Sequence, residues 1–478
     1  MENKSRSSNN KDTILFVDDL RAGTVEAFKS YNKTASSKLK ILLAVDQSKP
    51  KNARQIRQHY EKSPVEIISL NFRSRIKIKK ALKPYVDSLV AVVAQSEDRI
   101  PELKKVIPHV PYLPTPTVES LDWSTDKVLM RRMIDAHDSS LTPKFAVAKS
   151  ASLEVIEKVA RHIGYPVVVK PAGLGGSRLV SMSYHEDELQ HVLKKTFRKL
   201  QKAYREQNGR GEPQVVIEQV MEGDMYSIDG YVDAKGKVVL CPVVHVKTGK
   251  EIGFDDFFGY QQLTPTQLSK SSIDGASKAT LETIKALGLR STTIHCELFR
   301  TEKGWKIIEL GPRMGGYRDI LYMLTYGIDH IMNDVLIRMG SVPVVPKKRL
   351  GYAVYMKFYA KEEGTLINLS GTSKLKKLES FISVRVDKKV GDEVLYAKHG
   401  DGPIIKLVLF NKERSGLLAD IRRAEQSIVM KTQRTNVFRK QLEETADAIL
   451  QPIEDVELMS KKAAKKVKDK VAEVFEDL

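Results

Sequence analysis

The segment HCELF at residues 295–299 and the segment IIELGPR at residues 307–313 are two apolar runs joined by a short turn that contains Gly304. Each run carries one glutamate, and a hairpin over this stretch would hold the carboxylates of Glu297 and Glu309 close together. Carboxylates held that close repel each other unless a cation lies between them. Mg²⁺ prefers a few carboxylates together with phosphate oxygens. The stretch therefore points to a Mg²⁺–nucleotide site; glutamates that are solvated or paired with lysine are the alternative.

The segment VVVKPAGLGGSR at residues 167–178 is typical of a strand, a lysine and a glycine-rich turn. Glycines let backbone N–H groups approach phosphate oxygens, and Lys170 adds charge where the strand ends. The lysine precedes Gly173, Gly175 and Gly176, so the segment is not a P-loop, in which Gly-Lys-Ser/Thr closes the motif. Taken alone, it fits a phosphate loop and a plain glycine hairpin equally well.

A third segment, IEQVMEGD at residues 217–224, combines an extended stretch with acids. Free backbone groups and an apolar lining suit the edge of an adenine ring, and an acid a few residues further on can accept hydrogen bonds from ribose hydroxyls. A strand followed by an ordinary acidic turn explains the same residues. The segment alone favours the second interpretation.

Length and composition place the chain among globular proteins with several domains. It has 478 residues, of which 41% are hydrophobic, enough for two to four domains with cores of their own. Its two cysteines, Cys241 and Cys296, cannot build a disulfide framework or a structural zinc site, which fits a reducing cytosol. The polar N-terminus shows no signal peptide, and no apolar run approaches the ~20 residues that span a bilayer. We therefore expect a cytoplasmic protein without a membrane segment.

The chain is basic, with a formal net charge of +19. Residues 1–110 contain 22 Lys and Arg against 12 Asp and Glu, so about half of the excess lies in the first quarter. Such a cluster could bind nucleic acid. No aromatic-basic motif or zinc finger accompanies it, so we expect a solvated basic surface or attraction of anionic substrates instead.

Two Pro-rich stretches, residues 107–116 and 343–347, divide the chain. Before the first, four apolar segments alternate with helix-compatible segments and predict a small parallel α/β unit without the GxGxxG of a dinucleotide site. After the second, alternating residues over 350–410 predict a β-rich cap. The four predicted strands are 13–17, 41–45, 65–69 and 89–93.

Several local elements follow from the same pattern. A helix is expected to begin at Ser124 as its N-cap, and a mobile loop is expected over 196–214. Single helices are expected over about 320–339 and 412–432. Apolar residues on one face of 454–478, among many lysines, predict a helix for packing or oligomer formation.

The order of the site segments is more distinctive than any one of them. Lys127 opens a predicted helix, Lys170 follows about forty residues later, Glu218 about fifty after that, and the hairpin glutamates about eighty further on. This ordered set resembles the ATP-grasp superfamily, specifically its carboxylate–amine ligase branch, which includes L-amino acid ligases. Biotin carboxylase and D-alanine–D-alanine ligase are more distant members. The resemblance covers roughly residues 12–432.

The resemblance implies an α/β fold with an α+β ATP-grasp core. Residues 12–120 would form an N-terminal parallel α/β domain. Residues 121–345 would form a two-part ATP-grasp domain, with a small lid subdomain that carries the glycine loop at about 138–222. A β-rich C-terminal cap would span 346–432, and a charged helical tail 433–478.

The resemblance also assigns nucleotide-binding roles. Lys127 and Lys170 would hold the ATP phosphates, with Lys170 counted among the catalytic residues, and the flexible phosphate loop would run from Gly173 through Gly175 and Gly176 to Ser177. Glu218, Gln219 and Val220 would meet adenine, with Asp224, or else Glu222, on the ribose.

For the reaction itself, the resemblance makes Glu297 and Glu309 the ligands of Mg²⁺ or Mn²⁺. Arg313 would neutralise the transferred phosphoryl group or the tetrahedral intermediate. The third metal ligand of such enzymes is often an asparagine two residues after the second glutamate, and Gly311 stands there. The number of metal ions therefore stays open.

Of the residues around this set, His295 and Arg318 have two interpretations each. His295 lies two residues before Glu297 and either supports it or is a satisfied buried histidine. Gly315 and Gly316 would let a substrate approach the backbone. Arg318 would either pair with a substrate carboxylate or form a structural ion pair.

The implied reaction joins a small carboxylate, such as an amino acid, to an amine through an acyl phosphate, and releases ADP and phosphate. Phosphoryl transfer of this kind needs positioning and charge neutralisation, and no nucleophile triad is apparent. Three alternatives remain: a carboxylation like that of biotin carboxylase, a non-catalytic nucleotide-binding module, and a basic nucleic-acid-binding protein. The substrates are the expected partners, together with a second copy of the chain in a homodimer.

Overall fold

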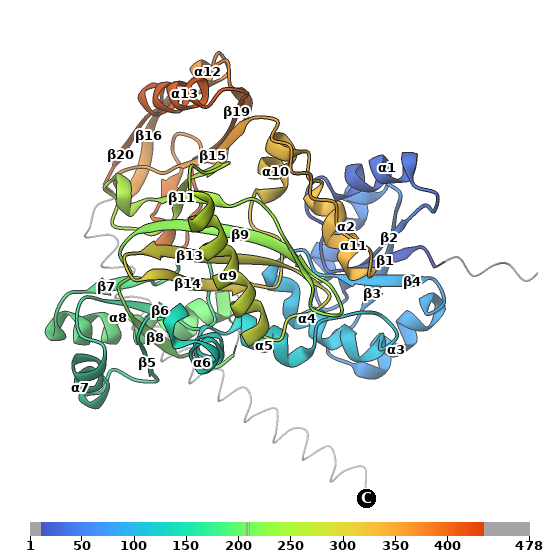
Figure 1. Cartoon of the computed structure of the whole chain (residues 1–478), viewed down its shortest axis with the longest axis horizontal. Coiled ribbons are helices and arrows are strands. Elements are labelled where there is room, and N and C mark those ends of the chain that lie inside the picture. Colours follow the sequence, from blue (N-terminus) through green and yellow to red (C-terminus); the bar gives the residue numbers. More distant parts are fainter. Residues whose placement is uncertain (1–10, 207–208, 210, 435–478) are drawn as a thin grey trace, which may run out of the picture.

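The computed structural model describes residues 11–206, 209 and 211–434. The predicted helix over 454–478, like the rest of the tail after residue 434, lies outside the described residues. Figure 1 shows an N-terminal domain on one side of the molecule, a small subdomain on the other, and a large twisted sheet between them. Among the described residues, no helix has the length and apolar character needed to cross a membrane.

The N-terminal domain is the predicted parallel sheet. Its strands follow the order β3-β2-β1-β4, and all five residues of β1 are buried, as expected for a parallel sheet covered on both faces. The loops after β1 and β4 carry Arg21 and Glu97 to the central part of the molecule. The elements are β1 (Thr13–Val17), α1 (Thr24–Thr34), β2 (Lys40–Asp46), α2 (Pro50–Tyr60), β3 (Val65–Leu70), α3 (Arg75–Leu82), β4 (Leu89–Val93) and α4 (Ile100–Val106).

Two helices, α5 (Val118–Thr125) and α6 (Lys127–His137), lead into the next domain. The predicted cap at Ser124 is wrong, because Ser124 lies inside α5. Asp126 caps α6 instead, and its carboxylate accepts hydrogen bonds from the backbone N–H groups of Val128 and Leu129 at 2.8 and 3.1 Å. Aspartate and serine cap helices about equally well, so the apolar pattern could not separate the two positions.

The small subdomain is a four-stranded antiparallel sheet in the order β5-β8-β6-β7. The loop predicted over 196–214 is wrong in its first part, because α8 continues to Glu206. Thr196, Leu200 and Ala203 continue the buried face of this helix, while its charged residues face solvent. The elements are β5 (Phe145–Ala148), α7 (Leu153–His162), β6 (Val167–Pro171), β7 (Ser181–Ser183), α8 (Glu186–Glu206) and β8 (Val215–Gln219).

The central sheet has nine strands, with β14-β13-β9-β11-β12-β15-β19-β17 in order and β10 beside β9. The strands after residue 346 thus extend this sheet, and only β18, β16 and β20 form a separate small one. Its strands are β9 (Asp224–Val232), β10 (Val238–Leu240), β11 (Val244–Thr248), β12 (Gly259–Thr264), β13 (Thr292–Thr301), β14 (Gly304–Gly311), β15 (Tyr352–Phe358), β17 (Phe381–Val386) and β19 (Ile405–Asn411).

Helix α9 (Lys270–Ala286) determines which face of this sheet is free. Ile294, Cys296 and Leu298 of β13 lie in one buried cluster with Ala276 and Ala279 of α9. Because side chains alternate along a strand, the residues between them point to the opposite face. That face carries the predicted site.

Two helices predicted as single elements are different in the structure. The helix expected over 320–339 is broken into α10 (Arg318–Tyr326) and α11 (His330–Arg338), because Gly327 adopts the left-handed conformation with φ of 69°. The helix expected over 412–432 stops earlier, as α13 (Arg414–Ser427), and β20 (Val429–Gln433) then pairs with β16 (Gly364–Ser370).

The remaining elements are short. They are β18 (Glu393–Val394), α12 (Thr372–Leu375) and the 3₁₀ helices η1 (Lys83–Tyr85), η2 (Glu97–Arg99), η3 (Ile107–His109), η4 (Ser139–Leu141), η5 (Lys250–Ile252) and η6 (Ala397–His399).

Candidate active site

A cavity of about 630 Å³ lies between the small subdomain, the N-terminal domain and the free face of the central sheet. It gathers predicted residues from distant segments of the chain. Gly173, Asp224 and Gly315 do not line it. The predicted residues that do are Lys127, Lys170, Gly175, Gly176, Ser177, Glu218, Gln219, Val220, His295, Glu297, Glu309, Arg313, Gly316 and Arg318.

The hairpin of β13 and β14 places Glu297 directly opposite Glu309. Residues paired in this way lie on the same face of a sheet. The two side chains are 27% and 29% exposed, so both carboxylates reach the cavity. The ammonium of Lys127 lies 3.4 Å from Glu309 and partly neutralises it.

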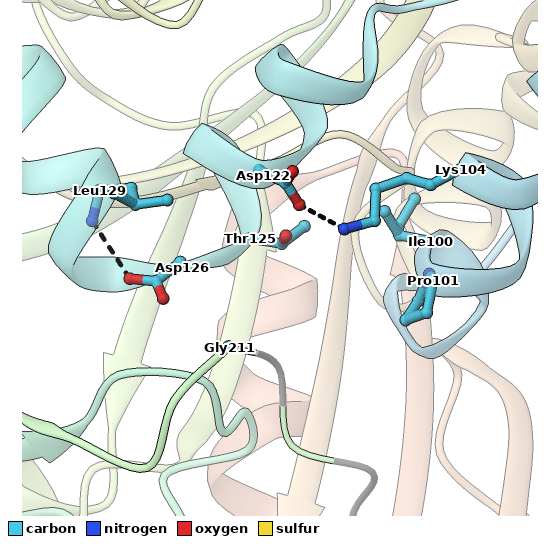
Figure 2. Close-up of a pocket in the computed structure, with 8 residues that line it drawn as sticks. All are labelled: Ile100, Pro101, Lys104, Asp122, Thr125, Asp126, Leu129 and Gly211. Carbon is cyan, nitrogen blue, oxygen red and sulfur yellow. Dashed lines mark hydrogen bonds and ion pairs between the residues drawn. The ribbon is translucent and has the colours of Figure 1, made fainter.

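Lys127 is held at the cavity by the start of α6. It is the first residue after the cap Asp126, its backbone N–H donates to the carbonyl of Ala172, and its Nζ donates to the carbonyl of Leu174 at 2.7 Å. Figure 2 shows Asp126 bonded to Leu129, beside a second cavity of about 220 Å³ that Asp122 and Lys104 also line. The capped helix end therefore links the lysine to the glycine loop.

Glu218 lines the cavity but is almost fully buried. It is 1% exposed and forms ion pairs with Arg131 at 2.7 Å and with Lys170 at 2.8 Å. Burial alone would raise the pKa of Glu218, but the charges of Arg131 and Lys170 outweigh it and lower the pKa to about 2. The carboxylate therefore holds Lys170 in place, and Arg131, which the sequence did not single out, completes the group.

Gln219, the last residue of β8, and Val220, which follows it, also line the cavity. Their backbone N–H groups donate hydrogen bonds within the protein. The N–H of Gln219 donates to the carbonyl of Lys144, and the N–H of Val220 donates to the carbonyl of Pro166. These two N–H groups are thus bonded within the protein in this structure.

The glycine loop divides into a fixed and an open part. The N–H of Gly173 donates to the hydroxyl of Tyr204 at 2.7 Å, which anchors the start of the loop. Gly175 and Gly176 are exposed, and a Cβ added to either would meet nothing within 4 Å. Beyond them, Arg178 donates to the carbonyl of His399 at 3.2 Å. The loop thus reaches from the small subdomain across to the C-terminal part of the chain.

Arg313 is paired with an acid from the N-terminal domain. Its Nη2 lies 3.1 Å from Glu97. Burial opposes the charge of the guanidinium, but Glu97 and the two hairpin glutamates raise the pKa of Arg313 above its ordinary value. A Cβ at Gly311 would lie 3.3 Å from the Glu97 carboxylate and 3.5 Å from Arg313 Nε. The Arg313–Glu97 pair thus lies against the position where related enzymes often have asparagine.

His295 belongs to a buried chain of hydrogen bonds. It lies 2.7 Å from Asp229 and 3.3 Å from Glu297. Asp229 is fully buried, receives the N–H of Gly315 at 2.7 Å and lies 2.9 Å from His330. The two histidines hold the pKa of Asp229 well below its usual range against the effect of burial, and Asp229 in turn raises the pKa of His295. This arrangement fixes the ring of His295 behind Glu297.

Arg318 is 2% exposed and bonded within the protein. Its guanidinium donates to Ser227 at 2.6 Å, to the side chain of Gln262, and to the carbonyl of Gly316 at 3.2 Å. Its charge contributes to the cavity wall, while most of its donors already have acceptors.

Sequence reasoning missed Arg131, Glu97, Asp229 and Lys357. Lys357 lies on β15, in the part of the central sheet formed by residues after 346, and lines the cavity. None of these four lies in a motif segment. For Glu97 the only signal was its place just after a predicted strand of the parallel sheet, where loops gather at one edge.

The residues present fit a divalent cation that arrives with a nucleotide. Within the part of the chain that the structure describes, no group of three or more His, Cys, Asp or Glu side chains is placed to hold a metal ion. Two cross-strand carboxylates that reach the same cavity are present, however. Mg²⁺ commonly takes one or two carboxylates and completes its shell with phosphate oxygens and water.

Comparison with known protein families gives a match for residues 163–319, which correspond to the ATP-grasp domain. This range contains the glycine loop, the Glu218 strand and the glutamate hairpin. An uncharacterized protein of Sinorhizobium fredii is 27% identical over 330 residues, which are 66% of this chain and 63% of that protein. The phosphoribosylamine–glycine ligase of Methanopyrus kandleri is 30% identical over 128 residues, 26% of each chain. The chain thus spans less than two thirds of either relative.

Comparison of structures extends the likeness to most of the chain. The crystal structure of an L-amino acid ligase from Bacillus licheniformis superposes with a TM-score of 0.66 and 16% identity. The superposition covers 89% of this chain and 100% of the other. At this identity the comparison establishes the fold: an N-terminal parallel sheet followed by the two antiparallel sheets that enclose the cavity.

Proposed function

Because the chain belongs to the ATP-grasp superfamily, we propose that it is an ATP-dependent ligase that joins a small carboxylate to an amine and releases ADP and phosphate. One observation carries the proposal. The cross-strand pair Glu297 and Glu309 shares a single cavity with Lys127, Lys170 and Arg313. Binding of a nucleotide for regulation alone would not need an arginine beside two carboxylates that can hold a metal.

The first step of the proposed reaction is phosphoryl transfer. A carboxylate oxygen of the first substrate attacks the γ-phosphorus of ATP, the bond to the β-phosphate oxygen breaks, and ADP leaves. Lys127 and Lys170 would hold the phosphates. Glu297 and Glu309 would hold a Mg²⁺ ion, which would neutralise charge at the phosphate oxygens.

The second step is acyl transfer. The amine attacks the acyl carbon of the acyl phosphate, the C–O bond to phosphate breaks, and the leaving phosphate takes up the proton that the nitrogen loses. Negative charge develops on the acyl oxygen and the leaving phosphate, and Arg313 can stabilise both with its fork of N–H donors. Water must be kept out, because it would hydrolyse the acyl phosphate. The glycine loop, which bridges toward His399, is suited to close the cavity.

The test is ADP release with ATP and Mg²⁺ over pairs of amino acids and other small carboxylates and amines. We expect ADP, phosphate and an amide product that depends on both substrates. Glu309→Gln should abolish turnover while the thermal melt stays as in wild type, since the amide keeps the shape and loses the charge that holds the metal.

The matched control for this substitution is Glu302→Gln, in the exposed turn of the same hairpin. It should keep wild-type turnover. AMP and pyrophosphate as products, or turnover of Glu309→Gln within about threefold of wild type, a cost of less than roughly 1 kcal/mol in the barrier, would refute the proposed mechanism.

A further inference from the structure

Lys357 is a cation of the cavity wall that forms no ion pair with an acid among the residues that the structure describes. Its neighbour across the strands β15 and β19 is Lys406, which forms an ion pair with Asp387 at 2.6 Å. Among the described residues, no carboxylate lies within 4.0 Å of the Lys357 ammonium. Burial, together with the charges of Arg318 and Lys406, lowers the pKa of Lys357 to about 8, although Glu297 acts in the opposite sense. Glu297 therefore compensates the ammonium only from beyond ion-pair distance.

The other cations of the cavity differ from Lys357 in this respect. Lys127 has Glu309, Lys170 has Glu218, and Arg313 has Glu97. Arg178 has Glu206, and Arg21 has Asp319. Arg318 is bonded to protein acceptors and lies 3.9 Å from Asp229. An incoming anion at the Lys357 end of the cavity therefore meets a cation that has no carboxylate of the described residues within 4.0 Å.

The surroundings of Lys357 are aromatic. Tyr359 and Phe258 line the same part of the cavity, with ring centroids 4.0 Å apart. On the other side, Lys357 Nζ lies 6.0 Å from the ring centroid of Tyr355, which stacks on Tyr317 at 3.7 Å. Such walls exclude water, and an ion pair formed there is stronger than one at the surface.

We propose that Lys357 binds a substrate carboxylate that does not itself react. The inference rests on the proposed ligase function. On the proposed roles, the reacting carboxylate meets the γ-phosphate near Lys127, Lys170 and Arg313, whose charges are already paired with acids. We therefore assign the anion at Lys357 to a second carboxylate. Its source is either the α-carboxylate of an amino acid acceptor or the second carboxylate of a dicarboxylic acyl donor. In both cases the structure assigns a substrate class in which one carboxylate survives into the product.

The test compares wild type with Lys357→Met, which keeps the length of the side chain and removes its charge. Amino acid acceptors are assayed against their α-amides, and dicarboxylic donors against their monoamides, by ADP release. Loss of a charge-assisted contact should lower kcat/KM about 10- to 100-fold for the substrate that carries the second carboxylate. The neutral analogue of that substrate should change less than twofold. The substrate that shows the difference identifies the source of the carboxylate.

Two further variants control this result. Lys406→Met removes the neighbouring cation. Its partner Asp387 still forms an ion pair with Arg385 at 2.6 Å, so this variant should keep kcat/KM near wild type for both the charged and the neutral substrate. Lys357→Arg should restore part of the preference for the charged substrate. An equal loss for charged and neutral substrates in Lys357→Met would mean a structural role and would overturn the inference.

A second readout does not depend on turnover, so that failure of the proposed function and failure of this inference can be distinguished. Lysines are dimethylated with ¹³C-formaldehyde, and the Lys357 signal is assigned by its absence in Lys357→Met. L-alanine, L-serine and L-phenylalanine, or succinate, should raise the pKa of this signal, whereas the three α-amides and succinamide should not. If none of the carboxylates moves the signal, the inference is wrong, whatever the ligase assay shows.

Discussion

The buried carboxylate of Glu218 offers the sharpest test of how the cavity wall is built. In Glu218→Gln, the amide can still accept hydrogen bonds, but Arg131, which is 2% exposed, loses its counter-charge. The fall of the Glu218 pKa from 4.5 to about 2 corresponds to roughly 3 kcal/mol of stability at neutral pH. This agrees with the 3–5 kcal/mol that breaking a buried ion pair typically costs. We expect the variant to be destabilised by about 3 kcal/mol at pH 7.

The sign of the pH dependence follows from the direction of the shift. Because the pKa is lower in the folded protein, the stabilisation is present above about pH 4.5 and is lost as the pH falls toward 2. At pH 3 the difference between wild type and Glu218→Gln should have shrunk to about 1 kcal/mol. The stabilities are measured by urea unfolding at the two pH values. A chain with several domains need not unfold in one step. Hydrogen exchange of the backbone amides of β8, a strand of the small subdomain, identifies the unfolding transition that includes this subdomain.

The control is Glu212→Gln, whose carboxylate is 79% exposed and pairs with Lys149 at 3.3 Å. A surface ion pair contributes about 0–1 kcal/mol, so this variant should differ little from wild type at either pH. A loss of less than 1 kcal/mol in Glu218→Gln at pH 7, or a loss that does not shrink at pH 3, would refute the reasoning.

Two further predictions concern the nucleotide. Gly175→Val should weaken ATP binding, measured by calorimetry. The melting temperature should change little, because no atom lies within 4 Å of the new Cβ and the backbone angle needs no glycine. Wild-type affinity would show that the phosphates bind elsewhere. Lys127→Met should lower ATP affinity and also reduce the increase in ATP affinity that Mg²⁺ gives, because Glu309 then lacks its cation even without nucleotide. An unchanged increase would show that Lys127 does not influence metal binding.

The N-terminal sheet and the glutamate hairpin could be predicted because their signals are local, whereas the ATP-grasp core was predicted from the resemblance that the order of the segments carries. The glutamate hairpin needs only two adjacent strands and a turn, so the sequence predicted that Glu297 and Glu309 lie close together, and the structure pairs them directly. The four strands of the N-terminal sheet were found for the same reason, since buried parallel strands are continuous apolar runs. Errors arose where tertiary packing decides the local structure, as in α8, whose charged surface suggested a loop.

The partners of the predicted residues could not be found in this way. Arg313 and Glu97 are 216 positions apart, and Arg131 and Glu218 are 87 apart. Glutamates and lysines are common on any surface, so nothing in their own sequence neighbourhood marks the few that meet in a cavity. Lys357 is the clearest case. It is distinguished because no carboxylate of the described residues lies within 4.0 Å of its ammonium, and only the three-dimensional structure can show this.

The pairing of cations with acids also explains how such a cavity can exist before its ligands arrive. A concentration of uncompensated charge in a half-buried wall would be costly. Lys127 and Glu309 avoid this cost by neutralising each other at 3.4 Å. A nucleotide phosphate alone would draw Lys127 away and leave Glu309 unpaired, and a metal ion alone would bind Glu309 and leave Lys127 unpaired. When both arrive together, each protein charge exchanges one partner for another, so under the proposed function we expect the cavity to favour the metal–nucleotide complex over either component.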